Sequence, residues 1–261
     1  MSNKEPNRND YVESTPNSRP KHETLHDTEI GYKQKGEKLT LKINLYHMNY
    51  KNQLVLNGQI NDVGAFTRIN IENSYRQGLE MESAFKANSK IKWKGNMTIS
   101  ENKIVKHTAY IDNWDNWGQE EVDYTDTDLA FSPNIIWSSI FSYRLNTNTS
   151  INLISKYVGK QYIDNTSSEY RMLEDYLVNN LRLSFNWKNK VFKKTEITLQ
   201  INNLLNNEYV SNAWVYRFIS DSWDPRESDP YVNADGERGY NMAGYFPEAT
   251  RNYLLALTLG F

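Results

Sequence analysis

Asn-Tyr-Leu-Leu-Ala-Leu-Thr-Leu-Gly-Phe, residues 252–261, is the stretch that decides the fold class of this chain. From Tyr253 onward every second residue is aromatic or aliphatic, and apart from Leu254 the residues between them are small or polar. A repeat of two is the period of a β-strand, in which successive side chains point to opposite faces. The stretch therefore predicts a β-strand with one strongly apolar face.

The same alternation recurs along most of the chain. It is found in residues 39–45, 79–86, 90–99, 134–144, 150–157, 181–188 and 197–202. Helical periodicity is weak throughout, and β-branched and aromatic residues, which favour strands, are concentrated on the apolar face. We therefore predict an all-β fold, an antiparallel up-and-down meander of about nine long strands.

The connections between these strands alternate in length. Short turns are predicted near residues 35–38, 87–89, 146–148 and 188–194, and long loops at residues 58–65, 102–130, 163–171 and 208–248. When every second connection of a meander is short, all short turns lie at one edge of the sheet and all long loops at the other. This asymmetry is typical of outer-membrane barrels, and it predicts that Phe261 lies on the short-turn side.

Composition excludes several classes of protein. Hydrophobic residues make up 38% of the 261 residues and the mean hydropathy is -0.77, so the large aliphatic core of a compact enzyme is disfavoured. The absence of cysteine excludes disulfides, thiolate metal sites and thiol nucleophiles. A net charge of -2 argues against nucleic-acid binding. No run of apolar residues is long enough for a transmembrane helix, a criterion that transmembrane strands do not need to meet.

Two architectures share this alternation. In a soluble β-sandwich or small barrel the apolar faces point inward, whereas in a membrane barrel they face lipid and the lumen is polar. The long strands, the one-sided loops and charged residues such as Lys92, Arg76 and Glu80, which a hydrated lumen accommodates, favour the membrane barrel. The alternative is a soluble all-β ligand-binding module of the carbohydrate type, in which Trp214 and Trp223 stack on a sugar.

Several segments resemble the TonB-dependent outer-membrane receptors. Residues 245–261, Tyr-Phe-Pro-Glu-Ala-Thr-Arg-Asn-Tyr-Leu-Leu-Ala-Leu-Thr-Leu-Gly-Phe, resemble the C-terminal strand of that family. Residues 201–209, Ile-Asn-Asn-Leu-Leu-Asn-Asn-Glu-Tyr, resemble its penultimate strand. Lys-His-Glu-Thr at 21–24 and Glu-Ile-Gly-Tyr at 29–32 are similar to the family's Lys-Pro-Glu-Thr and Glu-Xaa-Gly-Tyr motifs, with His22 in place of proline. The order and spacing of these segments also fit the family.

The resemblance implies the C-terminal part of a 22-stranded transmembrane β-barrel in the cell outer membrane of a Gram-negative bacterium. On this interpretation residues 1–20 are a polar segment left from an extracellular loop. Residues 21–261 are then the C-terminal part of the barrel, a fragment without the signal peptide, the plug domain and the N-terminal strands. The alternating residues of the last strand would be the signal read by the barrel-assembly machinery: Tyr253, Leu255, Leu257, Leu259 and Phe261.

Catalytic motifs are missing from the sequence. The four histidines are scattered, and no His-Glu-Xaa-Xaa-His, Gly-Xaa-Ser-Xaa-Gly or P-loop pattern is present. His22 and His26 would lie about 13 Å apart on an extended segment, too far to share a metal ion. We therefore expect no enzymatic activity, no cofactor and no metal site.

Two of the predicted long loops combine aromatic rings with charged groups and are the candidate ligand-binding regions. Rings and guanidinium groups in exposed loops suit recognition of a planar, sugar-like or anionic ligand. The alternative is that these rings pack the loops against one another. The candidate residues are Tyr110, Trp114, Trp117, Tyr124, Trp214, Tyr216, Arg217, Trp223, Arg226 and Tyr231.

The function predicted from the resemblance is active uptake of a scarce ligand. In this family TonB, coupled to the inner-membrane proton gradient, pulls on the plug to open a path, and ferric siderophores are the commonest cargo. The expected partners are outer-membrane lipid, the barrel-assembly machinery, the TonB complex acting through the plug, and a small-molecule ligand such as a ferric siderophore. Nucleic acid is not expected as a partner. A passive porin-like channel is a weaker alternative, because porins usually constrict without large aromatic loops.

Overall fold

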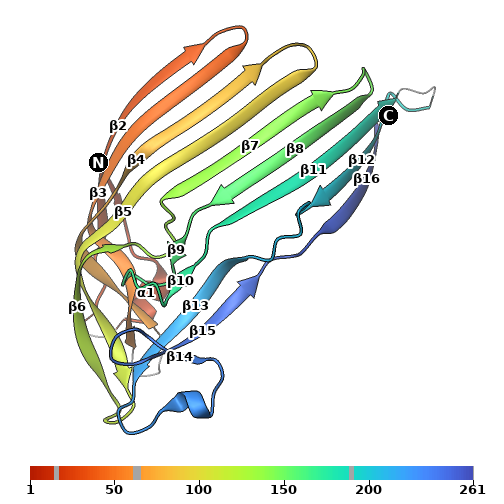
Figure 1. Ribbon diagram of the computed structural model, residues 1–261. Helices are drawn as coiled ribbons and strands as arrows, with labels where there is room; N and C mark the ends of the chain where they lie inside the picture. The colour runs from red at the N-terminus through yellow and green to blue at the C-terminus, as the bar shows by residue number, and fades with distance from the viewer. Residues whose placement is uncertain (15–17, 61–65, 188–190, 261) are drawn as a thin grey trace.

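A computed structural model describes residues 1–14, 18–60, 66–187 and 191–260, and one large antiparallel sheet dominates it (Figure 1). In this part of the chain, nine long strands lie side by side in chain order. They are β2 (Glu23–Lys35), β3 (Leu39–Ile60), β4 (Phe66–Lys86), β5 (Ile91–Asn113), β7 (Ile135–Arg144), β8 (Thr149–Val158), β11 (Tyr176–Trp187), β12 (Lys194–Asn202) and β16 (Asn252–Gly260). Each strand pairs antiparallel with the next, which confirms the predicted meander.

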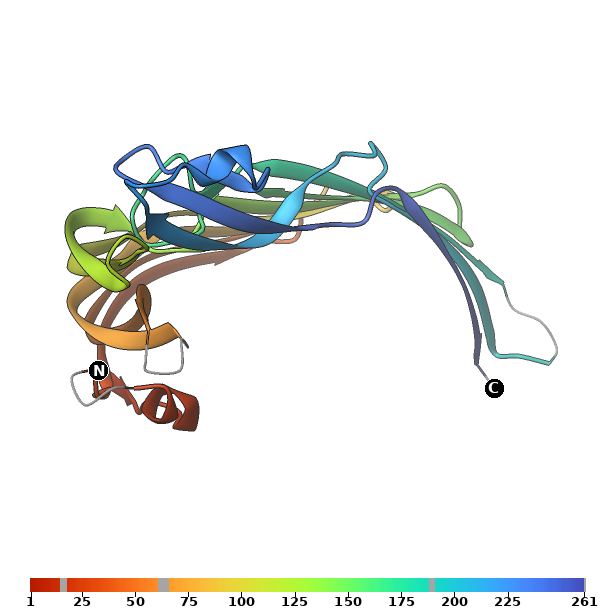
Figure 2. The same ribbon diagram turned by 90° about the horizontal axis from the view of Figure 1, so that it is seen from below.

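The sheet is strongly curved, and its first and last strands lie far apart at the two sides of the arch (Figure 2). At one side β1 (Ser2–Lys4) pairs with β2, and at the other β16 pairs with β12. Within the described ranges neither edge pairs with the other, so the sheet is an arc and not a closed barrel. No helix in these ranges has the length and apolar character needed to cross a bilayer.

Residues 1–20 hold β1 and the short helix α1 (Arg8–Val12). Asn7 and Asp10 form a capping box at the start of this helix, in which each side chain accepts a hydrogen bond from the other residue's backbone. The Asp10 carboxylate also pairs with Arg68 of β4 at 2.9 Å and is nearly buried. The polar N-terminal segment is therefore anchored to the wall of the sheet.

Apolar side chains form continuous rows across one face of the sheet, which we call the apolar face. One row crosses eight strands through directly opposed residues: Leu39, Phe85, Trp93, Phe141, Leu153, Leu181, Ile201 and Tyr253. On the opposite, polar face, Lys42 pairs with Glu82 at 2.6 Å, and Ser138 donates to Asn96 at 3.0 Å. The two faces differ because each strand alternates with a period of two.

The apolar face ends part-way along the longest strands. Leu45, Leu79 and Ile99 form its last row on β3, β4 and β5. The next residues on the same face are His47, Gln77 and Glu101. These three are joined by side-chain hydrogen bonds, 3.2 Å from His47 to Gln77 and 2.7 Å from Gln77 to Glu101. The rows up to this boundary form the apolar band. Beyond it the long strands carry polar residues together with buried apolar ones, of which Val55, Ile71 and Ile104 pack into a small core.

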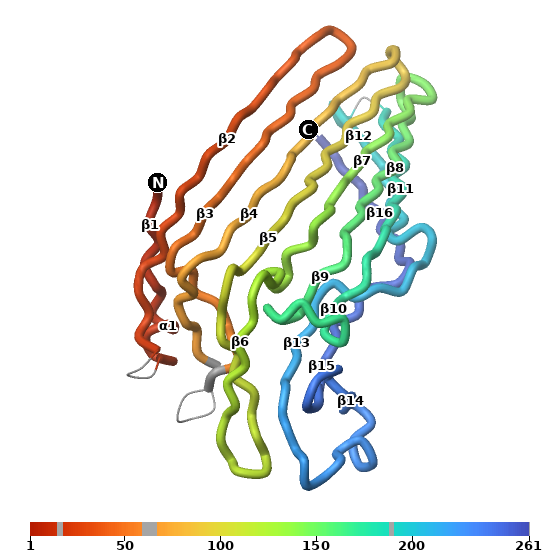
Figure 3. Tube along the Cα trace, turned by 60° about the vertical axis from the view of Figure 1, so that its left-hand side comes forward, coloured from red at the N-terminus to blue at the C-terminus, as the bar shows by residue number. Residues whose placement is uncertain are grey.

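The connections sort to opposite ends of the sheet, as predicted. The turns around residues 36–38, 87–90 and 145–148 lie at one end, together with the end of β16. Gly260 pairs with Lys194 there, while Phe261 itself lies outside the described residues, as does part of the predicted turn 188–194. The opposite end, called the loop end, carries the β6 and β13–β15 segments (Figure 3).

Two of the four predicted long loops are largely strand. Residues 102–130 form a hairpin of β5 with β6 (Gly118–Asp128). Residues 208–248 contain β13 (Val210–Ile219), β14 (Val232–Ala234) and β15 (Tyr240–Pro247). The prediction of irregular loops was wrong here because these strands lie beyond the apolar band, where polar and apolar residues no longer alternate with a period of two. The stretch 163–171 does connect two short strands, β9 (Gln161–Tyr162) and β10 (Met172–Leu173), whereas 58–65 falls mostly outside the described residues.

Candidate functional site

The loop end is closed by a contact between strands far apart in sequence. The end of β13 pairs in parallel with the end of β5 through Phe218 with Asp112 and Ile219 with Asn113. The Trp114 backbone N–H extends this ladder by donating to the Ile219 carbonyl at 2.9 Å. The β13–β15 hairpin is thereby fixed against the β5–β6 hairpin, and the segment around β9 and β10 contributes to the same region.

A cavity of about 480 Å³ lies within the loop end. Its walls come from β3, β4, β5, β13 and the segments at 129–131 and 163–166, and apolar side chains make up much of the surface. The polar and aromatic residues that line it are Gln53, Asn57, Arg68, Arg76, His107, Tyr110, Asp112, Phe131, Asp164, Asn165, Thr166, Trp214, Tyr216 and Arg217. A volume of this size, with a few convergent polar groups, is typical of small-molecule sites.

A hydrogen-bonded chain connects the two hairpins beside the cavity. The Trp114 indole N–H donates to the Tyr216 hydroxyl at 3.0 Å, and this hydroxyl donates to Asp112 at 2.6 Å. Burial, reinforced by the hydrogen bond to Asp112, raises the pKa of Tyr216 to about 12. The Trp114 ring also stacks between Phe218, at 4.0 Å between centroids, and Trp223, at 6.3 Å.

Arg171 is one of two charged residues of the loop end, with Asp235, that are fully buried, and 0% of its side chain is exposed. Its guanidinium pairs with Asp164 at 2.7 Å and donates to Thr166 Oγ1 at 2.7 Å and to the Asp235 carbonyl at 3.1 Å. A buried arginine requires such partners, because an uncompensated charge in the interior is strongly unfavourable. Arg171 therefore holds the β9–β10 segment to the β14–β15 connection.

A second arginine joins the same connection to β6. Arg217 pairs with the fully buried Asp235 at 2.9 Å and with Glu237 at 3.2 Å, and it donates to the Tyr124 hydroxyl at 3.2 Å. Burial lowers the pKa of Arg217, and the neighbouring Tyr124 and Asp235 more than offset this, so that its pKa is raised. Arg217 is thus a permanent cation at the cavity wall.

His107 lies at the same wall and is 5% exposed. Its ring stacks on Tyr124 at 5.6 Å, and its Nδ1 lies 3.5 Å from the Thr127 hydroxyl. Burial lowers the pKa of His107, although Asp164 and Asp123 oppose this effect. The imidazole is therefore held in its neutral form.

The strand alternation shifts by one residue before His107. Val105 and Lys106 are both exposed, and no partner of β6 faces Val105 in the register. After this irregularity His107, Ala109 and Ile111 turn to the interior. The pairing of β5 with β6 keeps its register across this point, and Asp126 of β6, at the position across from Val105, has a φ of +54°. This local irregularity of both strands changes which side chains face the interior, which explains how an imidazole from a regular-looking strand reaches the cavity.

The ten candidate ligand residues fall into three groups. The first group lines the cavity: Tyr110, Trp214, Tyr216 and Arg217. The second group lies beside the cavity, where Tyr124 contacts His107 and Arg217 of the lining and Trp114 stacks on Trp223. The remaining three lie outside the lining. Trp117 is 91% exposed in the β5–β6 turn, Arg226 is paired with Asp224, and Tyr231 is 71% exposed.

Sequence reasoning missed His107, Asp112, Asp164 and Arg171 as residues of this region. His107 was identified only as one of four scattered histidines, because the irregularity at Val105 that turns it to the interior leaves no sequence signal. Arg171 and Asp164 are seven residues apart in a segment that offers no aromatic cluster. The sequence indication of a buried ion pair here would have been an aspartate and an arginine in one short connection, with Thr166 and Ser168 between them.

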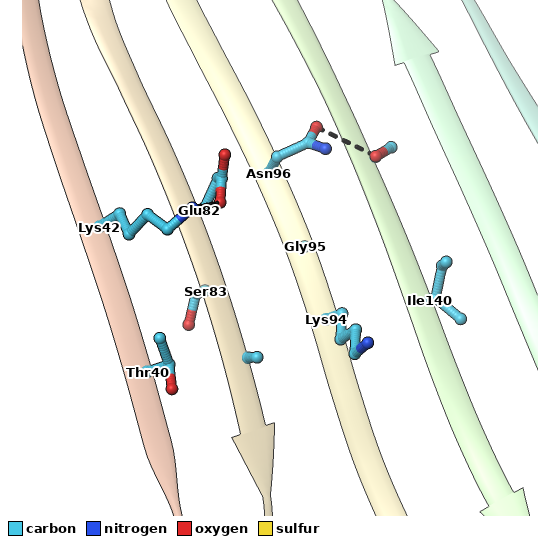
Figure 4. Close-up of a pocket in the computed structure, with 10 residues that line it drawn as sticks. Thr40, Lys42, Glu82, Ser83, Lys94, Gly95, Asn96 and Ile140 are labelled. Atoms are coloured by element: carbon cyan, nitrogen blue, oxygen red, sulfur yellow. Dashed lines mark hydrogen bonds and ion pairs between the residues drawn. The ribbon is translucent and has the colours of Figure 1, made fainter. Parts of the chain in front are cut away.

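A second, shallower depression of about 340 Å³ lies on the polar face within the barrel wall (Figure 4). Lys42, Glu82, Lys94 and Asn96 line it, and Figure 4 shows these side chains on neighbouring strands. Lys42 is neutralised by Glu82, whereas no ion pair is formed by Lys94 among the described residues. This depression is more polar than the cavity of the loop end and is open to one side.

The terminal strand presents the predicted apolar side chains on one face. Tyr253, Leu255 and Leu257 are 65%, 72% and 61% exposed, and Leu259 is 39% exposed. No described strand pairs with the free side of β16. The edge therefore combines unpaired backbone groups with an apolar face.

The profile of the family described as "TonB dependent receptor-like, beta-barrel" matches residues 6–204. The chain belongs to this family. TonB-dependent receptor barrels reside in the outer membrane, so the apolar band is the surface that faces lipid. Membership in a family of receptor barrels agrees with the expectation that the chain is no enzyme, and it decides against the soluble binding module.

Solved structures of TonB-dependent receptors share the fold. The ferric-catecholate import receptor Fiu of Escherichia coli K12 in its closed form superposes with a TM-score of 0.58 at 17% identity, covering 95% of this chain and 29% of Fiu. The siderophore receptor PiuA of Acinetobacter baumannii gives 0.60 at 14% identity, over 90% of this chain and 28% of PiuA. The copper transporter OprC gives 0.66 at 13% identity, over 97% of this chain and 35% of OprC. Comparison with curated proteins gives no significant match.

The chain thus spans about a third of the length of the solved receptors that it matches. The nine long strands described above pair in chain order from β2 to β16 without closing on themselves, which is the arrangement expected for an arc of a larger barrel. The predicted fold class and family are confirmed by these comparisons.

Proposed function

We propose that this chain forms part of the wall and the ligand-binding loop end of a TonB-dependent receptor that imports a ferric siderophore. The cavity of the loop end is the observation that carries the proposal. It lies beyond the apolar band, where a ligand arriving from outside meets the barrel, and rings and guanidinium groups line it. Several receptors with the same fold, Fiu and PiuA among them, are described as ferric-catecholate or siderophore receptors.

The proposed partners follow from the two ends of the wall. Outer-membrane lipid contacts the apolar band, and the barrel-assembly machinery recognises the exposed apolar residues of β16. The described residues supply the wall and loops of the barrel. The TonB complex is proposed to act through a plug domain seated in that barrel. The polar N-terminal segment, anchored through Asp10 to Arg68, is proposed to belong to an extracellular loop.

Uptake of radioactive iron tests this proposal. Iron-starved cells that express the native gene are supplied with ⁵⁵Fe bound to a catecholate siderophore, and uptake is compared with that of cells lacking the gene. We expect uptake to require both the gene and TonB. The matched variant pair is Trp214→Ala, which removes a ring from the cavity wall, and Trp117→Ala, which removes an exposed ring outside it.

Trp214→Ala is expected to lower uptake at limiting siderophore concentration about tenfold, the effect of losing one aromatic contact with the ligand, while Trp117→Ala leaves uptake unchanged. Uptake that continues without TonB would contradict active transport. If the cells took up copper but no ferric siderophore, copper would replace the ferric siderophore as the proposed cargo.

A further inference from the structure

Basic side chains accumulate on the polar face of the sheet, at the end that carries the short turns. Three neighbouring rows of directly opposed residues cross the strands there, and among the described residues of these rows the only acid is Glu82. The cations of the three rows, which we call the basic patch, are Lys33, Lys35, Lys42, Lys86, Lys92, Lys94, Lys156 and Arg182.

The charge of the basic patch is hardly compensated within the wall. Glu82 pairs with Lys42 at 2.6 Å, and no carboxylate of the described residues pairs with any other cation of the patch. Lys86 lies directly opposite Lys92, and Lys33 lies directly opposite Lys42. Like charges in opposed positions destabilise a sheet. The arrangement therefore favours a partner that brings carboxylates to this face.

Other acids of the region do not neutralise the patch. Glu196 of β12 is paired with Lys194 at 2.7 Å, and Glu37, in the turn between β2 and β3, forms no ion pair with the residues that the structure describes. Three acids of the polar face on β2 and β4 lie in rows nearer the loop end: Asp27, Glu29 and Glu80. Charge is thus sorted along the strands, with the positive end at the short turns.

Isoleucines are exposed on the same face, beside the basic patch. Ile136 and Ile140 of β7 are 37% and 39% exposed, and Ile154 of β8 lies directly opposite Ile140. Lys94 faces Ile140 from β5, and both side chains line the depression of the polar face (Figure 4). Apolar side chains within a rim of charged ones are typical of a protein–protein interface. A small anion would need only the cations.

The extent of the patch also favours a protein as the partner. From Lys33 on β2 to Lys156 on β8 there are five strand spacings, about 24 Å along the sheet at the usual distance between strands. A small anion contacts two or three of these lysines, whereas a folded domain can present carboxylates to all of them. The apolar band meets lipid on the other face, so this domain lies in the hollow of the arch (Figure 2).

We propose that the basic patch, together with the isoleucines beside it, docks a folded protein domain whose facing surface is acidic around an apolar centre. The inference rests on the proposed function, in which a plug domain is seated in the barrel. It adds the chemistry of the plug surface and the strands against which that surface packs, β2 to β8.

Zero-length crosslinking of the native gene product in isolated outer membranes tests the docking surface. A carbodiimide joins an amine to a carboxylate only where the two are in contact, and mass spectrometry of the digested receptor identifies the linked residues. We expect Lys92 or Lys94 to be linked to an aspartate or glutamate outside residues 1–261. Lys42 and Glu82, 2.6 Å apart, are the internal control for the reaction. A linked control pair, with neither Lys92 nor Lys94 linked outside these residues, would overturn the proposal.

A photoreactive side chain distinguishes a protein partner from a small anion. With p-benzoylphenylalanine in place of Ile140, irradiation should form a crosslink to a peptide outside residues 1–261. The same side chain in place of Phe141, which lies on the apolar face and is 42% exposed, is the control and should form none. Absence of the Ile140 crosslink in the assembled barrel would reject a docked domain.

Charge variants measure the contribution of the basic patch to docking. Lys92→Glu combined with Lys94→Glu should lower the yield of the Ile140 crosslink about tenfold, because like charges facing each other across an interface oppose docking. Arginine at both positions should preserve the yield. Lys51→Glu, on the opposite face of β3, is the control. Equal yields in the glutamate and arginine variants, or an equal loss in Lys51→Glu, would reject the patch as the docking surface.

The two proposals fail separately. Intact TonB-dependent siderophore uptake without crosslinks from Lys92, Lys94 or position 140 would reject the docking surface and leave the uptake function standing. The expected crosslinks in a receptor that imports no ferric siderophore would reject the proposed cargo and keep the docking surface.

Discussion

The apolar band and the loop end of this molecule are specified in different ways. In the band every strand repeats one pattern, and each residue of a row such as Leu39, Phe85 and Trp93 is one of many equivalent contacts. At the loop end a few buried charged residues, above all Arg171 and Asp235, connect segments that share no pattern. Single substitutions should therefore be more damaging at the loop end, and the following changes test that difference.

The largest effect is expected for Arg171→Ala. It removes one partner of a buried ion pair, leaving Asp164 without its cation and Thr166 Oγ1 without the donor from Arg171, a change that typically costs about 3–5 kcal/mol. Hydrogen exchange of the amides in residues 161–173 and 232–242 should accelerate strongly, while that of the band strands stays slow. The control is Arg226→Ala, which breaks the exposed pair with Asp224. Equal protection in the Arg171 variant and the wild type would show that the loop end is held by other contacts.

A charge on the lipid-facing surface should have the next largest effect. Leu255→Arg places a guanidinium on the exposed apolar face of β16, and such a change near the bilayer midplane costs about 2–4 kcal/mol. Thr258→Arg is the matched control, because Thr258 lies on the opposite face, directly across from Glu196. Urea titration of the assembled barrel measures the free energy of unfolding of the two variants. If both variants were equally stable, the apolar face of β16 would not face lipid.

The contrast also explains what could be predicted from sequence. The meander, the chain order of its strands and the end at which β16 finishes followed from alternation, because lipid on one side and water on the other impose a period of two. Beyond Ile99 polar and apolar residues no longer alternate regularly, so β6 and β13 gave no alternating signal and were predicted as loops. The irregularity at Val105 and the burial of His107 and Arg171 depend on tertiary contacts that composition does not encode. Tyr110, Trp214 and Tyr216, which line the cavity, were among the predicted candidates because rings in long segments are conspicuous in a sequence.

A smaller effect is expected at Gly244, where the backbone lies close beneath the indole of Trp214. A Cβ at this position would overlap the indole, so Gly244→Val should displace the ring into the cavity and destabilise the hairpin by about 1–3 kcal/mol. Gly31→Ala is the control, since its nearest neighbour would lie 3.4 Å away. Siderophore uptake at limiting concentration and thermal unfolding report on the two variants. Unaltered uptake in Gly244→Val would mean that Trp214 does not shape the cavity.

The smallest effect is a pH dependence confined to the loop end. The pKa of Tyr216 is raised from 10.0 to about 12, so the neutral phenol is favoured in the folded state. Its stabilising contribution is complete below pH 10 and is lost as the pH rises through about 12. Tyrosinate absorbance near 295 nm should show one late-titrating phenol that is missing in Tyr216→Phe. Identical titration curves for the two proteins would refute the hydrogen bond to Asp112.

The parallel junction of β5 with β13 has a consequence for the order of assembly. It joins residues about one hundred positions apart in the chain, as the hydrogen bond from Tyr216 to Asp112 shows with its separation of 104 residues. Closing so long a loop before the intervening strands are paired is entropically unfavourable, and contacts of high sequence separation form late. β7, β8, β11 and β12 must therefore be in place before the junction forms. The cavity is thus the last feature to mature, and it appears only on a wall that is already built.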